Sequence, residues 1–165
     1  TATTGDDLIL VSSGEQLPGV PEHQLRLSGD YWFTSRWSLG GSVVAFSESY
    51  AYGNENNQHS AGTATDLQGN TRTFGGPGKV DGYAVVNLTT RYVFSNGLEI
   101  FGKITNLFDE RYSSTAILAE NSFDTGGNFL ADPDDWTREQ FDAPGAPLGG
   151  FIGVKYRFGA KKPRS

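Results

Sequence analysis

Aromatic side chains and one arginine stand in polar, glycine-rich stretches of the sequence, where they could contact a ligand. Exposed aromatic rings stack on flat groups such as catechols, porphyrins or sugars, and arginine adds a planar charge. More often such rings pack loops against one another, and both interpretations stay open. The candidate ligand-binding residues are Tyr50, Tyr52, Phe74, Phe123, Phe129, Trp136 and Arg138.

Residues 113–147 form the most acidic stretch of the chain. Seven acidic residues stand there against Arg138 alone, a net charge of −6 that equals the formal charge of the whole chain. This stretch is either a solvated surface segment or a ligand-facing lid whose negative field favours neutral, cationic or metal-bearing ligands over anionic ones. The aspartates at 132–135 lack the spacing of an EF-hand calcium loop. A short helix is expected instead, with Asp132 as N-cap and Pro133 at its first position.

The sequence carries little that could support catalysis or a metal site. Nucleophilic catalysis needs a nucleophile beside a positioned base, and neither Gly-x-Ser-x-Gly nor His-Glu-x-x-His is present. His59 next to Ser60 is a weak signal, and His23 is too distant in sequence to suggest a shared metal. There is no cysteine, and the acidic balance disfavours a nucleic-acid partner. We therefore expect no enzyme, no metal site and no intrinsic cofactor.

The segments that must position these residues show a period of two. In residues 23–33, Leu25, Leu27 and Tyr31 alternate with polar residues such as Arg26 and Asp30. This alternation is typical of a β-strand with one apolar and one polar face. It recurs along the chain and predicts an all-β fold with five antiparallel strands, at residues 23–34, 37–50, 83–94, 98–112 and 149–158.

The connections between these strands alternate in length. Residues 34–36 and 95–97 are tight turns, and the second contains the hairpin signal Asn-Gly. Residues 51–82 and 113–148 are long, polar connections. A transmembrane barrel has short turns on one rim and long loops on the other, with aromatic residues near the strand ends. A soluble β-sandwich is the alternative, but the connection pattern and strand lengths favour the barrel.

Five strands cannot close a membrane barrel, and an open sheet in lipid would leave backbone groups without partners. We therefore predict that the chain supplies the last five strands of a larger barrel. Charged residues on the polar strand faces should face its lumen and form ion pairs and hydrogen bonds across the wall. These lumen-facing residues are Arg26, Asp30, Arg91, Lys103, Lys155 and Arg157.

A family resemblance rests on two elements near the C-terminus. Asn106-Leu-Phe-Asp-Glu-Arg-Tyr112 is followed by a long loop and by a strand ending Tyr156-Arg-Phe158, and this arrangement resembles the C-terminal region of TonB-dependent outer-membrane receptors. The resemblance covers roughly residues 15–158. Residues 104–112 are expected to form the extracellular end of the penultimate strand. Val154, Tyr156 and Phe158 belong to the terminal strand that such barrels use for assembly.

The resemblance implies a barrel of about 22 strands with a plugged lumen, located in the bacterial outer membrane. It implies TonB-energised uptake of a scarce nutrient, most strongly an iron–siderophore complex, so that a metal chelate would be ligand rather than cofactor. The implied partners are the remaining strands, the plug domain, the TonB complex, the barrel-assembly machinery and outer-membrane lipid or lipopolysaccharide. A passive porin or structural barrel and an outer-membrane barrel hydrolase are the alternatives.

This interpretation divides the chain into three parts. Residues 1–22 are expected to be an extracellular loop segment, and residues 23–158 the C-terminal part of the barrel. Residues 159–165 follow the terminal Phe158 as a short basic tail, which we expect to be periplasmic. Family members usually end at the terminal phenylalanine, so this tail departs from their pattern.

Overall fold

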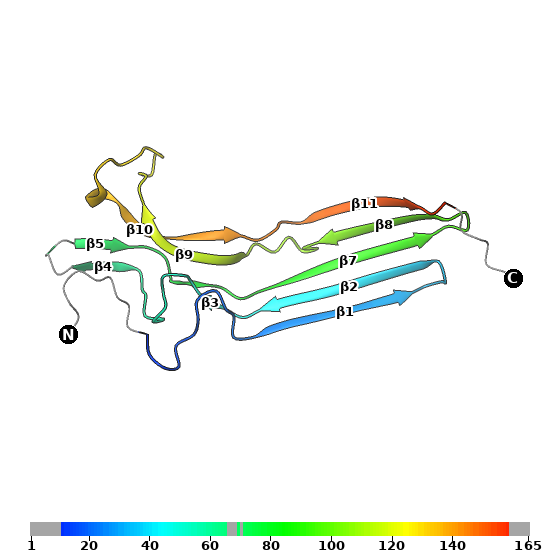
Figure 1. Ribbon diagram of the computed structural model, residues 1–165, viewed down its shortest axis with the longest axis horizontal. Helices are drawn as coiled ribbons and strands as arrows, with labels where there is room; N and C mark the ends of the chain where they lie inside the picture. The colour runs from blue at the N-terminus through cyan, green and yellow to red at the C-terminus, as the bar shows by residue number, and fades with distance from the viewer. Residues whose placement is uncertain (1–10, 66–68, 70, 159–165) are drawn as a thin grey trace. The chain divides into compact units, whose positions relative to one another are not determined.

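The computed structural model describes residues 11–65, 69 and 71–158, and nearly all of its regular structure is β-strand (Figure 1). No helix in this part of the chain is long and apolar enough to cross a membrane. The tail at 159–165 and the first ten residues of the segment 1–22 lie outside the described residues. The elements are β1 (Gln24–Trp32), β2 (Trp37–Phe46), β3 (Ser49–Tyr50), β4 (Gly62–Thr65), β5 (Thr71–Phe74), β6 (Lys79–Val80), β7 (Tyr83–Val93), β8 (Leu98–Thr105), β9 (Ser113–Asn121), the 3-10 helix η1 (Pro133–Asp135), β10 (Thr137–Pro144) and β11 (Gly149–Tyr156).

The chain divides into two compact units, which are described separately. The wall unit consists of His23–Phe46, Tyr83–Arg111 and Ala146–Ser165. The loop unit consists of Thr1–Glu22, Ser47–Gly82 and Tyr112–Gly145.

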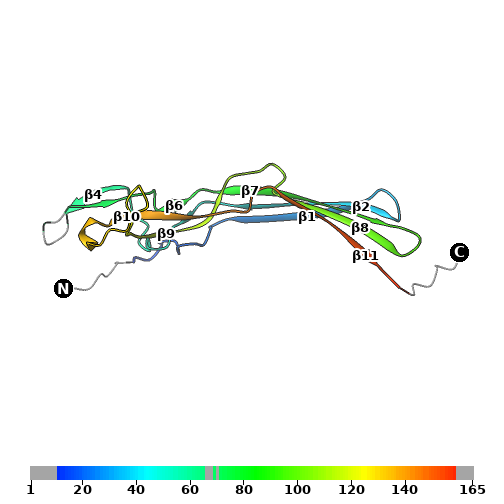
Figure 2. The same cartoon turned by 90° about the horizontal axis from the view of Figure 1, so that it is seen from above.

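The wall unit is one antiparallel sheet with the strand order β1-β2-β7-β8-β11 (Figure 1). Asp30, Gly40, Thr89, Lys103 and Phe151 are register partners in successive strands, so they form one row across the sheet. Seen from above, β11 runs at an angle to β1, which is the twist expected of a β-sheet (Figure 2). All five strands were predicted from the alternation of the sequence, and their presence confirms that prediction.

One face of this sheet is apolar, and no protein covers it in the described residues. The register places leucine, isoleucine and valine residues of all five strands on this face. Leu27 is 59% exposed, Val154 67% and Ile152 78%. A contiguous apolar face of this extent requires an apolar solvent or partner. The face therefore has the character of the lipid-facing side of a membrane barrel.

Aromatic rings gather where this face reaches the two tight turns. Phe33 stacks on Trp37 with ring centroids 4.3 Å apart, and Tyr92 meets Phe94 edge to face at 4.7 Å. Tyr156 and Phe158 form a third pair, also at 4.7 Å. Such a band of rings is the girdle that anchors barrel strands at a membrane interface.

Two of the predicted strands end earlier than expected. The predicted strand 37–50 is β2 alone, because Ser49 and Tyr50 leave the wall and pair with β6 in the loop unit. The predicted strand 98–112 stops at Thr105, because Asn106 adopts a left-handed backbone conformation with φ of 51°. That conformation is uncommon for residues other than glycine and is tolerated best by asparagine and aspartate. Residues 106–112 are therefore a turn, and placing them at the end of the strand was wrong.

The long connections 51–82 and 113–148 also contain strands, which the sequence did not predict. In the loop unit they form a four-stranded sheet of order β4-β5-β10-β9, and β3 pairs with β6. The buried apolar side chains of the described residues are Ala51, Val80 and Ala116, all of them in this unit. So small a core means that backbone hydrogen bonds and polar side chains carry much of the unit's stability. The expected short helix is present as η1, and Asp132 Oδ1 accepts from the Asp134 amide at 3.0 Å.

Candidate functional site

The loop unit carries an open pocket of about 240 Å³. Two of the predicted ligand-binding residues, Phe74 and Arg138, lie in its wall. The lining also includes one imidazole and two carboxylates. The full set is Gly53, His59, Phe74, Gly75, Leu118, Ala119, Glu120, Arg138 and Glu139.

Three strands bring the charged and aromatic groups of this pocket together. Arg138 of β10 is the parallel partner of Phe74 in β5 and the antiparallel partner of Glu120 in β9. The Arg138 guanidinium lies 5.8 Å from the centroid of the Phe74 ring, within cation–π range. Its Nη2 donates to Glu120 Oε1 at 2.7 Å. Both side chains are partly exposed, so this ion pair fixes the position of the guanidinium more than it stabilises the fold.

His59 forms another part of the wall and is held from two sides. Its backbone amide donates to Asn54 Oδ1 at 2.9 Å, and its Nε2 lies 3.2 Å from the Gly76 carbonyl oxygen. A neutral ring can make that contact only with the proton on Nε2, so the hydrogen bond assigns this tautomer. The ring meets Phe74 edge to face at 6.4 Å. The pocket therefore presents two rings and a guanidinium in fixed positions.

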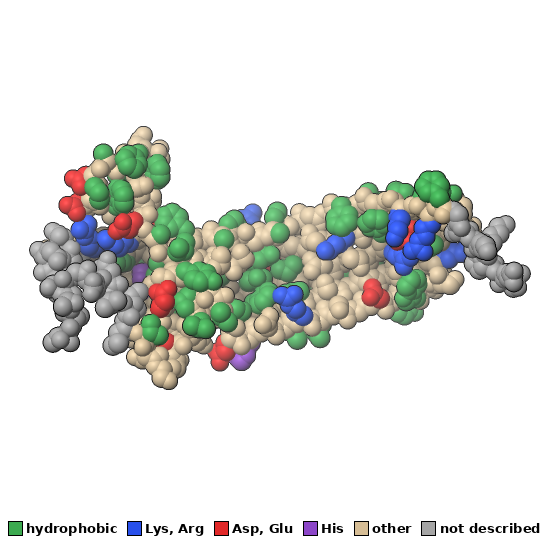
Figure 3. Space-filling model, viewed as in Figure 1, with side chains coloured by type: hydrophobic (Ala, Val, Ile, Leu, Met, Phe, Trp, Pro, Cys, Tyr) green, Lys and Arg blue, Asp and Glu red, His purple; other side chains and the backbone are tan. Residues whose placement is uncertain are grey.

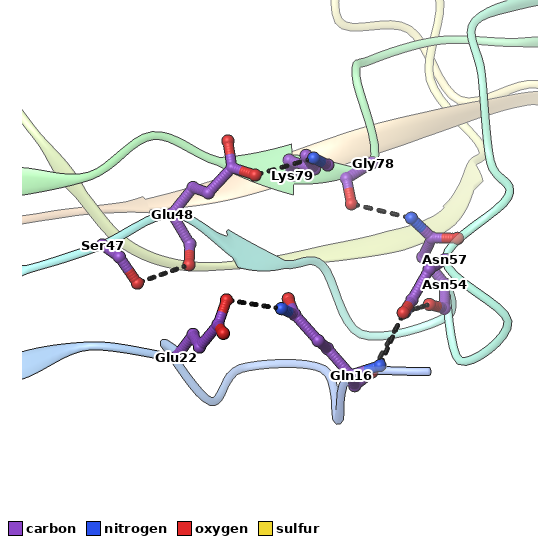
Figure 4. A network of polar contacts seen from close by, with 8 residues as sticks. All are labelled: Gln16, Glu22, Ser47, Glu48, Asn54, Asn57, Gly78 and Lys79. Atoms are coloured by element: carbon purple, nitrogen blue, oxygen red, sulfur yellow. Dashed lines mark hydrogen bonds and ion pairs between the residues drawn. The ribbon is translucent and has the colours of Figure 1, made fainter. Parts of the chain in front are cut away.

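Asparagine side chains hold backbone segments of the loop unit together, and Figure 4 shows two of them, Asn54 and Asn57. Asn54 is 1% exposed, and its Nδ2 donates to the Gly78 carbonyl at 2.9 Å. Asn57 Oδ1 accepts from the Gln16 amide at 2.6 Å, and its Nδ2 donates back to the Gln16 carbonyl at 3.0 Å (Figure 4). These side-chain amides make hydrogen bonds to backbone groups of distant segments, as a neighbouring strand would do in a sheet. Neither asparagine was among the residues predicted from the sequence.

Two of the other predicted aromatic residues contact parts of the loop unit outside the pocket wall. Lys79 Nζ lies 4.8 Å from the Tyr50 ring centroid and 2.8 Å from Glu48 Oε1. The hydrogen bond to Glu48 raises the pKa of Lys79 above its usual 10.5. Tyr52 is half exposed, packs against Gly19 and bridges to Ile117.

The remaining predicted aromatics lie between β9 and β10. Phe123 and Phe129 form an isolated bridge with their rings 6.0 Å apart. Trp136 Nε1 donates to the Leu130 carbonyl at 2.8 Å. All three contact their own connection, and none of them lines the pocket. The structure thus brings together Phe74 and Arg138 of the predicted set.

The loop unit is strongly acidic, and each of its described basic side chains is paired. Arg72 lies 3.1 Å from Asp134, Lys79 2.8 Å from Glu48 and Arg138 2.7 Å from Glu120. Twelve carboxylates against these three cations give the described residues of the unit a net charge of −9. The carboxylates are Glu15, Glu22, Glu48, Glu55, Asp81, Glu120, Asp124, Asp132, Asp134, Asp135, Glu139 and Asp142. Nowhere in this part of the chain do three or more His, Cys, Asp or Glu residues converge as a metal site would require.

The wall unit carries its charges on the face opposite the apolar one. There Arg91 makes a two-point ion pair with Glu99, with Nε 2.8 Å from Oε1 and Nη2 3.1 Å from Oε2. Arg26 lies over the ring of Phe46 at 5.8 Å. Asp30, Lys103 and Lys155 line a shallow hollow of about 650 Å³ with Arg91 and Glu99. Figure 3 shows basic side chains gathered near the turn-side ends of these strands.

Five of the residues predicted to face a lumen lie within paired strands, and the register places all five on this polar face. They are Arg26, Asp30, Arg91, Lys103 and Lys155. Arg157 follows β11, and its backbone amide donates to the Gly97 carbonyl oxygen at 3.1 Å. In the terminal strand, Val154 and Tyr156 point the other way and are exposed on the apolar face, and Phe158 beyond it is 90% exposed.

Comparison with known proteins gives one family match. A family model described as TonB dependent receptor-like, beta-barrel matches residues 2–107. No curated protein matches the sequence.

Solved structures give partial matches. The chain is similar to the closed form of the ferric-catecholate import receptor Fiu from E. coli K12, at 19% identity and a TM-score of 0.49, over 83% of this chain and 14% of that one. It is also similar to the ferripyoverdine receptor of the Pseudomonas aeruginosa outer membrane, at 16% identity and a TM-score of 0.47, over 82% and 14%. A mutant ferric enterobactin receptor from the same organism matches at 18% identity and a TM-score of 0.45, over 81% and 16%. The chain thus spans between 14% and 16% of the length of these solved chains.

Proposed function

Because the chain belongs to the TonB-dependent receptor β-barrel family, whose model matches residues 2–107, we propose that it forms part of an outer-membrane receptor for energised nutrient uptake. This family consists of transport receptors rather than enzymes. The family match carries the proposal. The uncovered apolar face of the wall sheet supports it, because such a face suits a strand wall in lipid.

The connections suggest how the chain is oriented in the membrane. The tight turns at 34–36 and 95–97 follow β1 and β7, beside the aromatic girdle, and suit the periplasmic rim. The segments of the loop unit join the opposite strand ends and suit the extracellular side. The polar face of the wall would then contact the plug domain. The remaining strands, the TonB complex, the barrel-assembly machinery and outer-membrane lipopolysaccharide complete the proposed set of partners.

For the ligand, we propose an iron–siderophore complex that is neutral or cationic. A ferric catecholate that carries several negative charges would meet the net charge of −9 of the described loop residues. The three cations of this unit already contact carboxylates within 3.1 Å, so their charge is largely offset before such an anion binds. A neutral or cationic chelate avoids this repulsion. It could place a flat group against Phe74, where Arg138 and His59 flank the ring.

Growth on defined iron sources tests this proposal. A strain lacking the whole receptor is grown on a neutral ferric hydroxamate and on an anionic ferric catecholate, each as the sole iron source. We expect the deletion to slow growth on the neutral chelate and the whole receptor to restore it. Unchanged growth on every iron source would reject iron uptake and favour another nutrient. A defect confined to the catecholate would reject the proposed ligand charge but keep the transport function.

The pocket itself is tested by variants of the whole receptor. Phe74→Ala should weaken binding of the neutral chelate, because it removes the ring that Arg138 and His59 flank. Phe129→Ala is the matched control, since its ring is 63% exposed and lies outside the pocket. Equal affinities for the two variants would remove the pocket from the binding site.

A further inference from the structure

The turn at residues 106–112 buries one polar residue, Asn106, whereas Asp109, Glu110 and Arg111 are exposed. Asn106 is 2% exposed, and both Asn106 and Asp109 adopt left-handed backbone conformations with φ of 51°. Phe108, by contrast, is 73% exposed. Two strained residues and one buried amide indicate that this turn is held in place by specific contacts.

The Asn106 side chain contacts two separate pieces of backbone. Its Nδ2 donates to the carbonyl oxygens of Glu110 at 2.9 Å and of Ala146 at 3.0 Å. Its Oδ1 accepts from the Glu110 amide at 2.9 Å. The Asn106 amide itself donates to Asn87 Oδ1 in β7 at 3.1 Å. One residue thereby joins β7, the end of β8 and the segment that precedes β11.

Asp109 makes a second contact with the same segment. Its Oδ1 accepts from the Leu148 amide at 2.9 Å. Leu148 directly precedes β11, whose first register pair joins Gly149 to Thr105 of β8. The side chains of Asn106 and Asp109 thus hold the chain on both sides of Pro147, immediately before the terminal strand begins to pair.

The alternation of β11 cannot fix this register alone. Residues 150, 152, 154 and 156 face the apolar side, and a slip of two residues along β8 would leave every side chain on its original face. Glycines at 149 and 150 reduce the side-chain packing that could resist such a slip, and the Phe101 ring of β8 packs over Gly153. The strand pair offers few contacts that distinguish the two registers, among them Phe101 on Gly153 and the hydrogen bond from Thr105 Oγ1 to the Gly149 carbonyl oxygen, so contacts outside the pair add to the choice of register.

We propose that Asn106 and Asp109 form a clip that sets the register of the terminal strand β11 against β8. The clip thereby positions β11 at the edge of the wall sheet, next to β8. It acts through hydrogen bonds to the Ala146 carbonyl and the Leu148 amide. It is independent of the ligand, because neither residue lines the pocket of the loop unit.

Disulfide trapping in the whole receptor, made free of other cysteines, tests the clip. Ile100→Cys with Val154→Cys reports the observed register, because these residues are direct partners. Ile100→Cys with Ile152→Cys reports a slip of two residues. Adding Asn106→Ala or Asp109→Ala should raise the ratio of slipped to in-register disulfide by roughly tenfold, because each variant removes a hydrogen bond that holds the segment before β11.

Matched variants separate the clip from general damage. Glu110→Ala should leave the ratio unchanged, since the clip uses only the backbone of Glu110. Phe108→Ala is the control for an exposed side chain. Asp109→Asn keeps an acceptor oxygen and should restore the observed register. If Asn106→Ala prevents insertion of the receptor into the membrane, the Asp109→Ala variant provides the test of the clip. It removes a single hydrogen bond, the one to the Leu148 amide. An unchanged ratio in folded Asp109→Ala receptor would overturn the proposal.

Discussion

Asparagine side chains, rather than an apolar core, are expected to keep the loop unit folded, and Asn54→Ala tests this most sharply. Asn54 is 1% exposed and joins the Gly78 carbonyl to the His59 amide. After the substitution, the Gly78 oxygen keeps its bond from the Ala51 amide at 2.9 Å. The His59 amide loses its acceptor, Asn54 Oδ1. The substitution therefore chiefly leaves one donor without a partner beside the pocket.

The size of the effect follows from that single lost partner. A buried donor without an acceptor costs about 1–3 kcal/mol, which corresponds to roughly a 5- to 150-fold change in an opening equilibrium. The wall unit should be unaffected, because its strands share no hydrogen bond with Asn54. We therefore expect local opening of the loop unit without global unfolding.

Hydrogen exchange of the whole receptor in detergent, followed by mass spectrometry, measures this change. Peptides covering residues 51–61 should exchange faster in Asn54→Ala by that factor, while peptides of β7 and β8 keep their rates. Asn56→Ala is the matched control, because its side chain makes only a local bond to the Gln58 amide. Equal exchange in the Asn54 and Asn56 variants would refute the claim that buried asparagines hold this unit.

Three further predictions concern the pocket, the wall and an acidic turn. Arg138→Ala should weaken chelate binding severalfold in calorimetry with little loss of stability, since exposed ion pairs contribute about 0–1 kcal/mol. Leu27→Arg should destabilise the folded barrel by about 2–4 kcal/mol in denaturant titrations if Leu27 lies near the bilayer midplane, and Ser28→Arg on the opposite face should cost less. Hydrogen bonds from Asn128 lower the pKa of Asp124 below its usual 3.8. The stability that Asp124 contributes should therefore be complete above pH 3.8 and lost as the pH falls through the folded pKa, and a carbon NMR titration of Asp124 should give a midpoint below 3.8.

The wall was predictable because membrane strands must alternate. Leu25, Leu27 and Tyr31 recur every second residue, and the tight turns mark where the strands reverse. The end of β8 was not predictable from this period. Apolar Leu107 and Phe108 follow Thr105 closely in the sequence, and only the left-handed backbone of Asn106 shows where the strand stops.

The strands of the loop unit escaped prediction for a different reason. β9 and β10 fully bury a single apolar side chain, Ala116, and they carry four charged residues, so their apolar alternation is weak. Their pairing depends on backbone hydrogen bonds, which leave little trace in the residue types.

The candidate site could be predicted only in part. Phe74 and Arg138 were each chosen as residues that could bind a ligand, but their contact joins strands far apart in sequence. His59 lines the same pocket as Phe74 and Arg138 only because the folded chain brings these distant segments together. Asn54 was missed because a buried asparagine in a polar stretch has the same local sequence as an exposed one.

Uptake of a radiolabelled neutral ferric chelate, in cells with and without TonB, tests the central claim most directly. The whole receptor should import the chelate in the presence of TonB, and import should fall to the level of cells lacking the receptor when TonB is absent. Equal uptake with and without TonB would contradict the account and indicate a passive barrel.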